Sequence, residues 1–376
     1  MALSFGQFIK ESFSPASYSD GGRLPFVDLA KGICIILVVI FHIDDTVILP
    51  NMEALRMPLY FTLSGIFFKS YGSAKVFFLK KFNNILIPFV FWVSLPLLLL
   101  PVFGLDAGSD ISSFADLSSA LFHETSFPNS PVWFLLCLFF ANLYFLALTI
   151  VLGDRYLIWG VLCFSLIGIA CSLLDFNLPL WLDTAFTSLP FFYLGYLLKS
   201  SLDRHSSLLP PVFKKFSQTS TPAIAPKTTP LSSSERSNRF SLLITGLVFI
   251  AASFLIYFFV EKSSFSMVSN YVGENPVISY VKSFFIVLGC LLACKAIIWL
   301  PLISFFGRYS IIVLCTHRLI ISTIQHSLSR FFDLSYSSPV LYLPLVLLVC
   351  WLAIFLCRNF LPFFTAQKPL LPIPTT

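Results

Sequence analysis

A lysine and a histidine stand eleven residues apart in one strongly apolar segment near the start of the chain. Lys31 and His42 lie on either side of the run Ile33–Phe41. Eleven residues of α-helix make about three full turns and rise about 16 Å, so both side chains lie on one face of the expected helix. Asp28 precedes Lys31 by three residues. Asp45 follows His42 by three, a spacing at which side chains meet on a helix.

This arrangement of residue types suits proton transfer. A neutral imidazole can take a proton from a hydroxyl near pH 7, which makes His42 a candidate general base. A carboxylate at Asp45 or Asp44 could orient the ring. His317 is a second candidate, because His317 and Arg318 stand together about nine residues into another apolar run, where packing alone rarely explains two ionisable groups.

The composition places these residues in a membrane. The chain has 376 residues, of which 57% are hydrophobic, and its 24 Lys+Arg and 18 Asp+Glu cannot cover the surface of a soluble globule. Apolar stretches that match the length of a bilayer-spanning helix recur throughout. A soluble enzyme, a disordered scaffold and a DNA-binding domain are therefore excluded. We interpret the net charge of +6 as orientation information.

Ten apolar stretches predict an all-α, polytopic integral membrane protein with about ten transmembrane helices. The stretches are 27–45, 54–69, 83–103, 131–152, 156–174, 178–198, 240–260, 277–298, 302–325 and 339–361. A segment over 199–239, rich in Ser, Thr and Pro, predicts a flexible cytoplasmic loop between helices 1–6 (26–198) and helices 7–10 (240–361). Residues 1–25 and 362–376 are expected to be a cytoplasmic segment and a cytoplasmic tail.

Basic residues set the expected orientation. With the N-terminus inside, 19 of the 24 Lys and Arg fall on the cytoplasmic side, as the positive-inside rule requires. Both termini are then cytoplasmic. The five cations outside this pattern are Arg56, Lys262, Lys282, Arg318 and Arg330.

Several candidates also have purely structural explanations. Lys31 could extend to the membrane interface and pair with Asp28, with His42 marking the far end of the span. Loop lysines and a cation at a span entrance can serve topology alone, and Ser64-Gly65 could simply allow close helix packing. The nine cysteines lie in or beside apolar runs, where Cys packs as a small hydrophobe, so we expect neither disulfides nor a metal site.

The stretch from Asp28 to His42 resembles the opening helix of the acyltransferase 3 family of integral membrane acyltransferases, particularly its fucose 4-O-acetylase-like branch. The family motif is an Arg, ten residues and a His. Lys31 stands at the Arg position, which keeps the charge but loses the bidentate guanidinium. Similar segments follow in order over about 290 residues: Arg56–Gly65, Phe78–Lys81, Leu86–Phe89, Pro131–Leu135, Trp181–Asp183, Pro190–Gly195 and Phe306–His317.

The resemblance implies transfer of an acyl group, usually acetyl from acetyl-CoA, to a hydroxyl of a glycan or a lipid-linked sugar. His42 would act as general base or acyl carrier, with Asp45 and His317 as the other catalytic candidates. His317 or Trp133 could stabilise the oxyanion. Cations at the predicted inner ends of the spans would bind the donor phosphates, and these are Lys31, Lys80, Lys81 and Arg308.

The implied partners are an acyl-CoA donor, a carbohydrate or lipid-linked carbohydrate acceptor and membrane lipids, with no nucleic acid. The implied location is the bacterial inner membrane. A transporter or flippase for a sugar-containing substrate is the main alternative, although the two halves of the chain show no convincing similarity to one another. A membrane domain that binds a partner without chemistry is the third interpretation.

Overall fold

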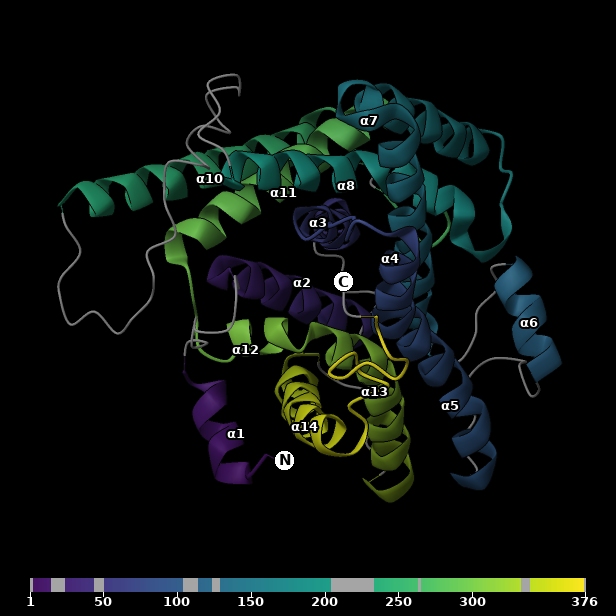
Figure 1. The fold of residues 1–376 in the computed structure, drawn as a ribbon. Coiled ribbons are helices and arrows are strands. Elements are labelled where there is room, and N and C mark those ends of the chain that lie inside the picture. Colours follow the sequence, from purple (N-terminus) through teal and green to yellow (C-terminus); the bar gives the residue numbers. More distant parts are fainter. Residues whose placement is uncertain are drawn as a thin grey trace.

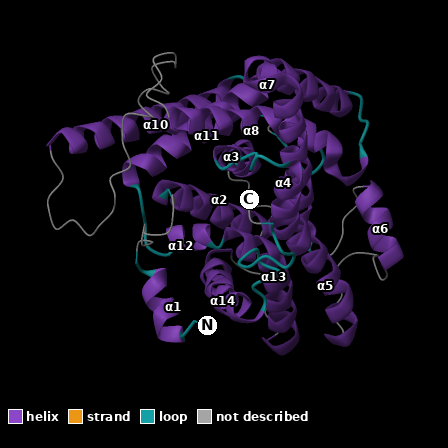
Figure 2. Ribbon diagram, in the orientation of Figure 1, coloured by secondary structure: helices purple, strands orange, loops and turns teal. Residues whose placement is uncertain are grey.

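The chain is all-helical in the part that the structure describes. The computed structural model describes residues 3–14, 24–43, 51–103, 114–123, 129–203, 233–262, 265–332 and 339–374. These ranges contain no β-strand, and their one isolated antiparallel bridge joins Ser266 to Tyr271 (Figure 2). The prediction of an all-α protein is confirmed.

Each of the ten predicted apolar stretches falls on a helix. The α-helices are α1 (Phe5–Ser12), α2 (Pro25–Ile43), α3 (Glu53–Ile66), α4 (Ala74–Lys81), α5 (Ile87–Phe103), α6 (Phe114–His123), α7 (Trp133–Leu173), α8 (Leu182–Asp203), α10 (Ser233–Phe259), α11 (Pro276–Ile297), α12 (Ile303–Arg308), α13 (Ser310–Phe332) and α14 (Pro339–Phe360). Two stretches share α7, which is interrupted at Gly153, where φ is 62° and ψ is 175°. Glycine adopts this non-helical backbone without a steric penalty.

Six segments of the described chain are long and apolar enough to cross a membrane. They are Pro25–Ile43, Ala74–Leu98, Ser130–Leu173, Ser233–Phe259, Pro276–Ile297 and Tyr342–Phe360. Helix α3 has only 14 residues, and α8 and α13 carry charged side chains such as Asp183 and Arg318. A count of about ten spans therefore stays a prediction, whereas helices suited to a bilayer are present.

Helix α2 lies between α3 on one side and α12, α13 and α14 on the other (Figure 1). Helix α3 crosses it (Figure 1). The Cys34 thiol donates to the backbone carbonyl oxygen of Arg56 at 2.9 Å, and the Tyr60 hydroxyl donates to the carbonyl oxygen of Lys31 at 3.4 Å. These two hydrogen bonds join the middle of α2 to α3.

Glycines allow several helices to touch through their backbones. A Cβ atom on Gly307 of α12 would collide with the backbone carbonyl oxygen of Asp28 in α2. The same holds between α3 and α8, where a Cβ on Gly65 would strike the carbonyl oxygen of Phe192 and one on Gly195 that of Thr62. Small residues permit such close helix packing, so the packing explanation for Gly65 is confirmed.

The segment predicted as a loop over 199–239 has helix at both ends. Helix α8 continues to Asp203 and α10 begins at Ser233. Residues 204–232 lie outside the described part of the chain.

None of the nine cysteines, all of which lie in the described part of the chain, forms a disulfide. Eight of them are buried, and Cys163 is exposed. The thiols therefore serve mainly as small apolar side chains within helix contacts.

Candidate active site

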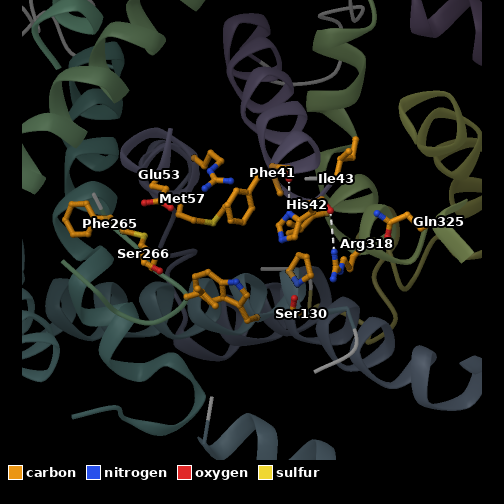
Figure 3. Close-up of a pocket in the computed structure, with 17 residues that line it drawn as sticks. Phe41, His42, Ile43, Glu53, Met57, Ser130, Phe265, Ser266, Arg318 and Gln325 are labelled. Atoms are coloured by element: carbon orange, nitrogen blue, oxygen red, sulfur yellow. Dashed lines mark hydrogen bonds between the residues drawn. The ribbon is translucent and has the colours of Figure 1, made fainter. Parts of the chain in front are cut away.

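A cavity of about 560 Å³ lies at the C-terminal end of α2. Its lining comes from α2, α3, α13, the start of α7 and the chain just after residue 264. His42, Arg318, Glu53 and Ser130 stand around it in Figure 3. The volume lies within the usual range for small-molecule sites, about 300–1,000 Å³.

His42 lines this cavity, and within the described residues only its Nδ1 has a hydrogen-bond partner. Its Nδ1 lies 2.8 Å from the backbone carbonyl oxygen of Val38, one turn earlier in α2. A carbonyl oxygen only accepts hydrogen bonds, so Nδ1 carries the proton and donates it. Nε2 of the neutral ring then holds a lone pair, which is the form that a general base or nucleophile requires.

His317 packs directly behind His42. The ring centroids are 5.0 Å apart at an interplanar angle of 71°, and Nε2 of His317 lies 3.4 Å from Nδ1 of His42. Nδ1 of His317 donates to the carbonyl oxygen of Val313 at 2.8 Å, which leaves its Nε2 as an acceptor. His317 is fully buried and does not line the cavity, so it can orient the His42 ring but does not face a substrate there.

Two arginines complete the polar part of the lining. Arg56 stacks on Phe41, with its Cζ atom 3.9 Å from the ring centroid. Nη1 of Arg318 donates to the backbone carbonyl oxygen of His42 at 3.4 Å (Figure 3). Both guanidinium groups act electrostatically on the His42 ring. Sequence reasoning counted both arginines among the cations outside the charge pattern, placed Arg56 in a family-like segment and Arg318 beside His317, and gave neither a role in the site.

One wall of the cavity is a loop held by hydrogen bonds. Phe265, Ser266, Met267 and Val268 form this wall. The Trp181 indole N–H donates to the carbonyl oxygen of Val268 at 2.9 Å. A second bond joins the Thr184 hydroxyl to the carbonyl oxygen of Met267 at 3.0 Å. Trp181 ends the short 3-10 turn Pro179–Trp181 and Thr184 lies in the first turn of α8, so this turn and the helix that follows it fix the wall in position.

Three predicted donor-site lysines lie away from the cavity, at the other end of α2. Nζ of Lys31 is 5.2 Å from the ring centroid of Phe67, the residue that ends α3. Nζ of Lys80 is 3.7 Å from the ring centroid of Tyr71, and Nζ of Lys81 is 5.4 Å from that of Phe77. The structure thus gathers these cations around one aromatic segment, 67–77.

Arg308, the fourth predicted donor-site cation, is engaged in ion pairs. Its Nη1 lies 3.1 Å from Oε1 of Glu11, and its Nε lies 3.8 Å from Oδ2 of Asp28. Arg358 binds the other Glu11 oxygen at 2.8 Å, and the Tyr309 hydroxyl donates to Oε1 at 2.5 Å. Burial raises the pKa of the Glu11 carboxyl, but the bonds from Arg358 and Tyr309 and the two arginine charges outweigh it, so the pKa is lowered overall.

The structure therefore brings together only part of the predicted site. His42 and His317 meet, whereas Lys31, Lys80, Lys81 and Arg308 lie at the opposite end of α2. Asp45 lies outside the described residues. Arg56 and Arg318 were not among the predicted site residues. The sequence did give one signal for them, because they are two of the five cations that the predicted topology does not place on the cytoplasmic side.

Comparison with known proteins gives one family match. A family model described as an acyltransferase domain, that of the acyltransferase 3 family, matches residues 24–358. No curated protein and no solved structure matches the chain. The family match spans α2 to α14 and so includes His42, both cavity arginines and all six helices suited to a bilayer. The chain therefore belongs to the acyltransferase 3 family and is an integral membrane acyltransferase.

Proposed function

We propose that the protein transfers an acetyl group from acetyl-CoA to a hydroxyl of a glycan or lipid-linked sugar, as in the fucose 4-O-acetylase-like branch of the family. One observation carries this proposal. The Nδ1 proton of His42 is committed to Val38, which leaves the Nε2 lone pair for a substrate at a cavity of small-molecule size.

In the direct mechanism, Nε2 of His42 takes the proton of the acceptor hydroxyl while the oxygen attacks the thioester carbonyl carbon. A C–O bond forms, and collapse of the tetrahedral intermediate breaks the C–S bond. The proton on His42 then passes to the departing thiolate. In the competing version Nε2 attacks the thioester carbonyl, and the C–S bond breaks to release the CoA thiolate. The acceptor hydroxyl then takes the acetyl group from Nε2 as the N–C bond breaks, and its proton passes to the thiolate. Neither version requires a metal.

Two further residues support this chemistry. The imidazolium that forms on His42 keeps its Nδ1–H bonded to Val38 and close to Nε2 of His317, which holds the ring in one orientation. Trp133 also lines the cavity, and its indole N–H is a donor that could meet the oxyanion. His317 is thus a positioning residue in this proposal. Asp45 remains a candidate to orient the ring.

The donor phosphates are assigned to the lysine end of α2. Lys31, Lys80 and Lys81 supply three positive charges there, and anionic phosphates bind most strongly to such clusters. Eleven residues of helix separate Lys31 from His42, about 16 Å, a distance that the long pantetheine arm of CoA would have to bridge. Arg308 contributes less directly, because its guanidinium already holds Glu11 and Asp28.

The proposal includes a location. We place the protein in a bacterial inner membrane with about ten spans and both termini in the cytoplasm. Acetyl-CoA is cytosolic, so the lysine end of α2 faces the cytoplasm and the cavity lies toward the other side. The concentration of Lys and Arg on one side of the predicted topology supports this orientation.

Transfer of radiolabel from acetyl-CoA to membrane glycan or lipid-linked sugar tests the function. We expect the wild-type protein to label this fraction. His42→Ala should lower turnover by about 10²- to 10⁴-fold, the usual contribution of a general base. His326→Ala is the matched control, since His326 lies on the helix of His317 but does not line the cavity. Full activity of folded His42→Ala would reject both mechanisms, and sugar movement without labelling would indicate a transporter.

A further inference from the structure

The described lining of the His42 cavity carries more positive than negative charge. Arg56 and Arg318 reach it from α3 and α13, and both act electrostatically on His42. Glu53 is the one acidic side chain among the described lining residues. A concave site with this balance raises the local concentration of anions. The charge therefore indicates a ligand that bears a negative group.

The Arg56 guanidinium stacks on an aromatic ring, and Glu53, three residues earlier in α3, acts on it electrostatically without forming an ion pair with it. Arg56 is 9% exposed, and its Cζ stacks 3.9 Å from the centroid of Phe41. None of the three ion pairs formed within the described chain includes Arg56 or Arg318. Stacking uses the flat face of a guanidinium and leaves its N–H edge, which binds a carboxylate or phosphate through two parallel hydrogen bonds.

Arg318 places a second cation beside the proposed base. Its Nη1 donates to the backbone carbonyl oxygen of His42 at 3.4 Å. This carbonyl belongs to the last turn of α2, where backbone oxygens lack partners within the helix. A guanidinium has five N–H donors, so one such contact leaves the others for a ligand.

Aromatic rings form part of the apolar lining of the same cavity. Phe41, Trp133 and Phe265 all contribute to it. The Trp133 ring is supported from behind by Trp181, with ring centroids 5.8 Å apart. Rigid aromatic faces beside a few polar groups provide a flat apolar surface that suits the C–H face of a sugar ring.

We propose that this cavity binds an acidic acceptor sugar, with its carboxylate or phosphate held by Arg56 and Arg318 and one of its hydroxyls directed at His42. The inference rests on the proposed acyl transfer and names the class of acceptor. The phosphates of acyl-CoA offer the same anionic chemistry as an acidic sugar. Donor and acceptor are therefore varied independently in the experiment below.

The experiment uses the full chain in proteoliposomes with radiolabelled acetyl-CoA. Methyl β-glucuronoside and glucose 6-phosphate are the acidic probes, and methyl β-glucoside is the neutral one. We expect kcat/KM to be about 10-fold or more higher for an acidic probe, because charge-assisted hydrogen bonds are lost with the glucoside. The glucuronoside and the phosphate separate carboxylate recognition from phosphate recognition.

Arg56→Gln removes both the positive charge and the two parallel N–H donors of the guanidinium. It should raise KM for the acidic probes by about 10- to 100-fold, while KM for acetyl-CoA stays within about 2-fold. Arg56→Lys keeps the positive charge but loses the paired N–H donors of the guanidinium, so it should raise KM for the acidic probes severalfold. It replaces Arg56→Gln in the test if that variant does not fold. Arg155→Gln, at an exposed position in α7, is the matched control and should keep wild-type constants.

Three results would overturn the proposal. The first is equal use of the glucoside and of both acidic probes by the wild-type protein. The second is a rise in KM for acetyl-CoA alone in Arg56→Gln, which would assign the arginines to the donor. The third is absence of both acylation and binding of radiolabelled glucuronoside in equilibrium dialysis. Binding that depends on Arg56 without acylation of any probe would retain the acidic-sugar site and reject the proposed acyl transfer.

Discussion

The two ends of α2 use their charges in different ways. At the N-terminal end, Arg308 is paired with Glu11 and Asp28, and Arg358 binds Glu11 as well. At the C-terminal end, Arg56 and Arg318 make no ion pair with a described residue and line a cavity beside His42. Charges that satisfy one another hold helices together, whereas charges that face a cavity are available to a ligand.

The cavity end should respond to small changes behind the base. His317→Leu keeps a buried side chain of similar size but removes the acceptor beside Nδ1 of His42. We expect kcat to fall by up to about 100-fold, about 2.7 kcal/mol, with both KM values little changed. His317→Gln retains an acceptor oxygen and should restore part of the rate. If His317→Leu lowered the rate only because less of the protein stayed folded, as thermal unfolding would show, His317 would have a purely structural role.

Substitutions at the N-terminal end of α2, where the ion pairs lie, should change the stability of the protein. Gly307→Ala would place a Cβ against the backbone carbonyl oxygen of Asp28 and force α12 away from α2. Overpacking of this kind costs about 2 kcal/mol, so we expect a lower midpoint of thermal unfolding in detergent. Gly6→Ala is the control, because no atom lies within 4 Å of a Cβ built there. Equal midpoints for the two variants would contradict the close contact.

Glu11 links the paired end to pH. Its pKa is lowered in the folded state, so its contribution is complete above the unfolded pKa and is lost as the pH falls through the folded pKa. Glu11→Gln should cost about 1.5 kcal/mol of unfolding free energy at pH 7, because hydrogen bonds to a charged partner are lost. Unfolding midpoints measured from pH 7 to pH 3 should converge for variant and wild type. A constant difference across that range would refute the ionic role.

The lysine cluster should produce the smallest effect. Lys80→Ala and Lys81→Ala, alone or together, should raise KM for acetyl-CoA by about 2- to 5-fold at low salt and less at high salt, since partly exposed charges are screened. Lys75→Ala, exposed on the same helix, is the matched control. Constants equal to those of Lys75→Ala would remove both lysines from the donor site and leave only a topological role.

Much of the fold could be predicted because helix formation in an apolar run is a local property. The run Ile33–Phe41 predicts a spanning helix, and α2 covers Pro25–Ile43. The same reasoning failed at the 199–239 boundary, where helix extends into polar sequence as far as Asp203. Polar residues continue a helix readily when its apolar part is already fixed by packing.

The candidate site could be predicted only in part. His42 was accessible to sequence reasoning because an ionisable group in an apolar run calls for an explanation. Arg56 stands near a span end, where a cation is ordinary, and nothing local indicates that it meets Arg318, which lies inside another apolar run. The available signal was that the predicted topology does not place these two arginines on the cytoplasmic side. The ion pair of Arg308 was equally hidden in the sequence, since its partner Glu11 is 297 residues away.

The sequence by itself determined that this protein is helical, resides in a membrane and carries a histidine where lipid would not favour one. Those properties depend on composition and on a period of 3.6 residues, which each segment expresses alone. Only the tertiary structure decided which cations are paired and which face the cavity. Ion pairing depends on helices far apart in the chain, as Arg358 and Glu11 show across 347 residues. Charge and spacing therefore predicted the histidine, while helix packing determined its neighbours.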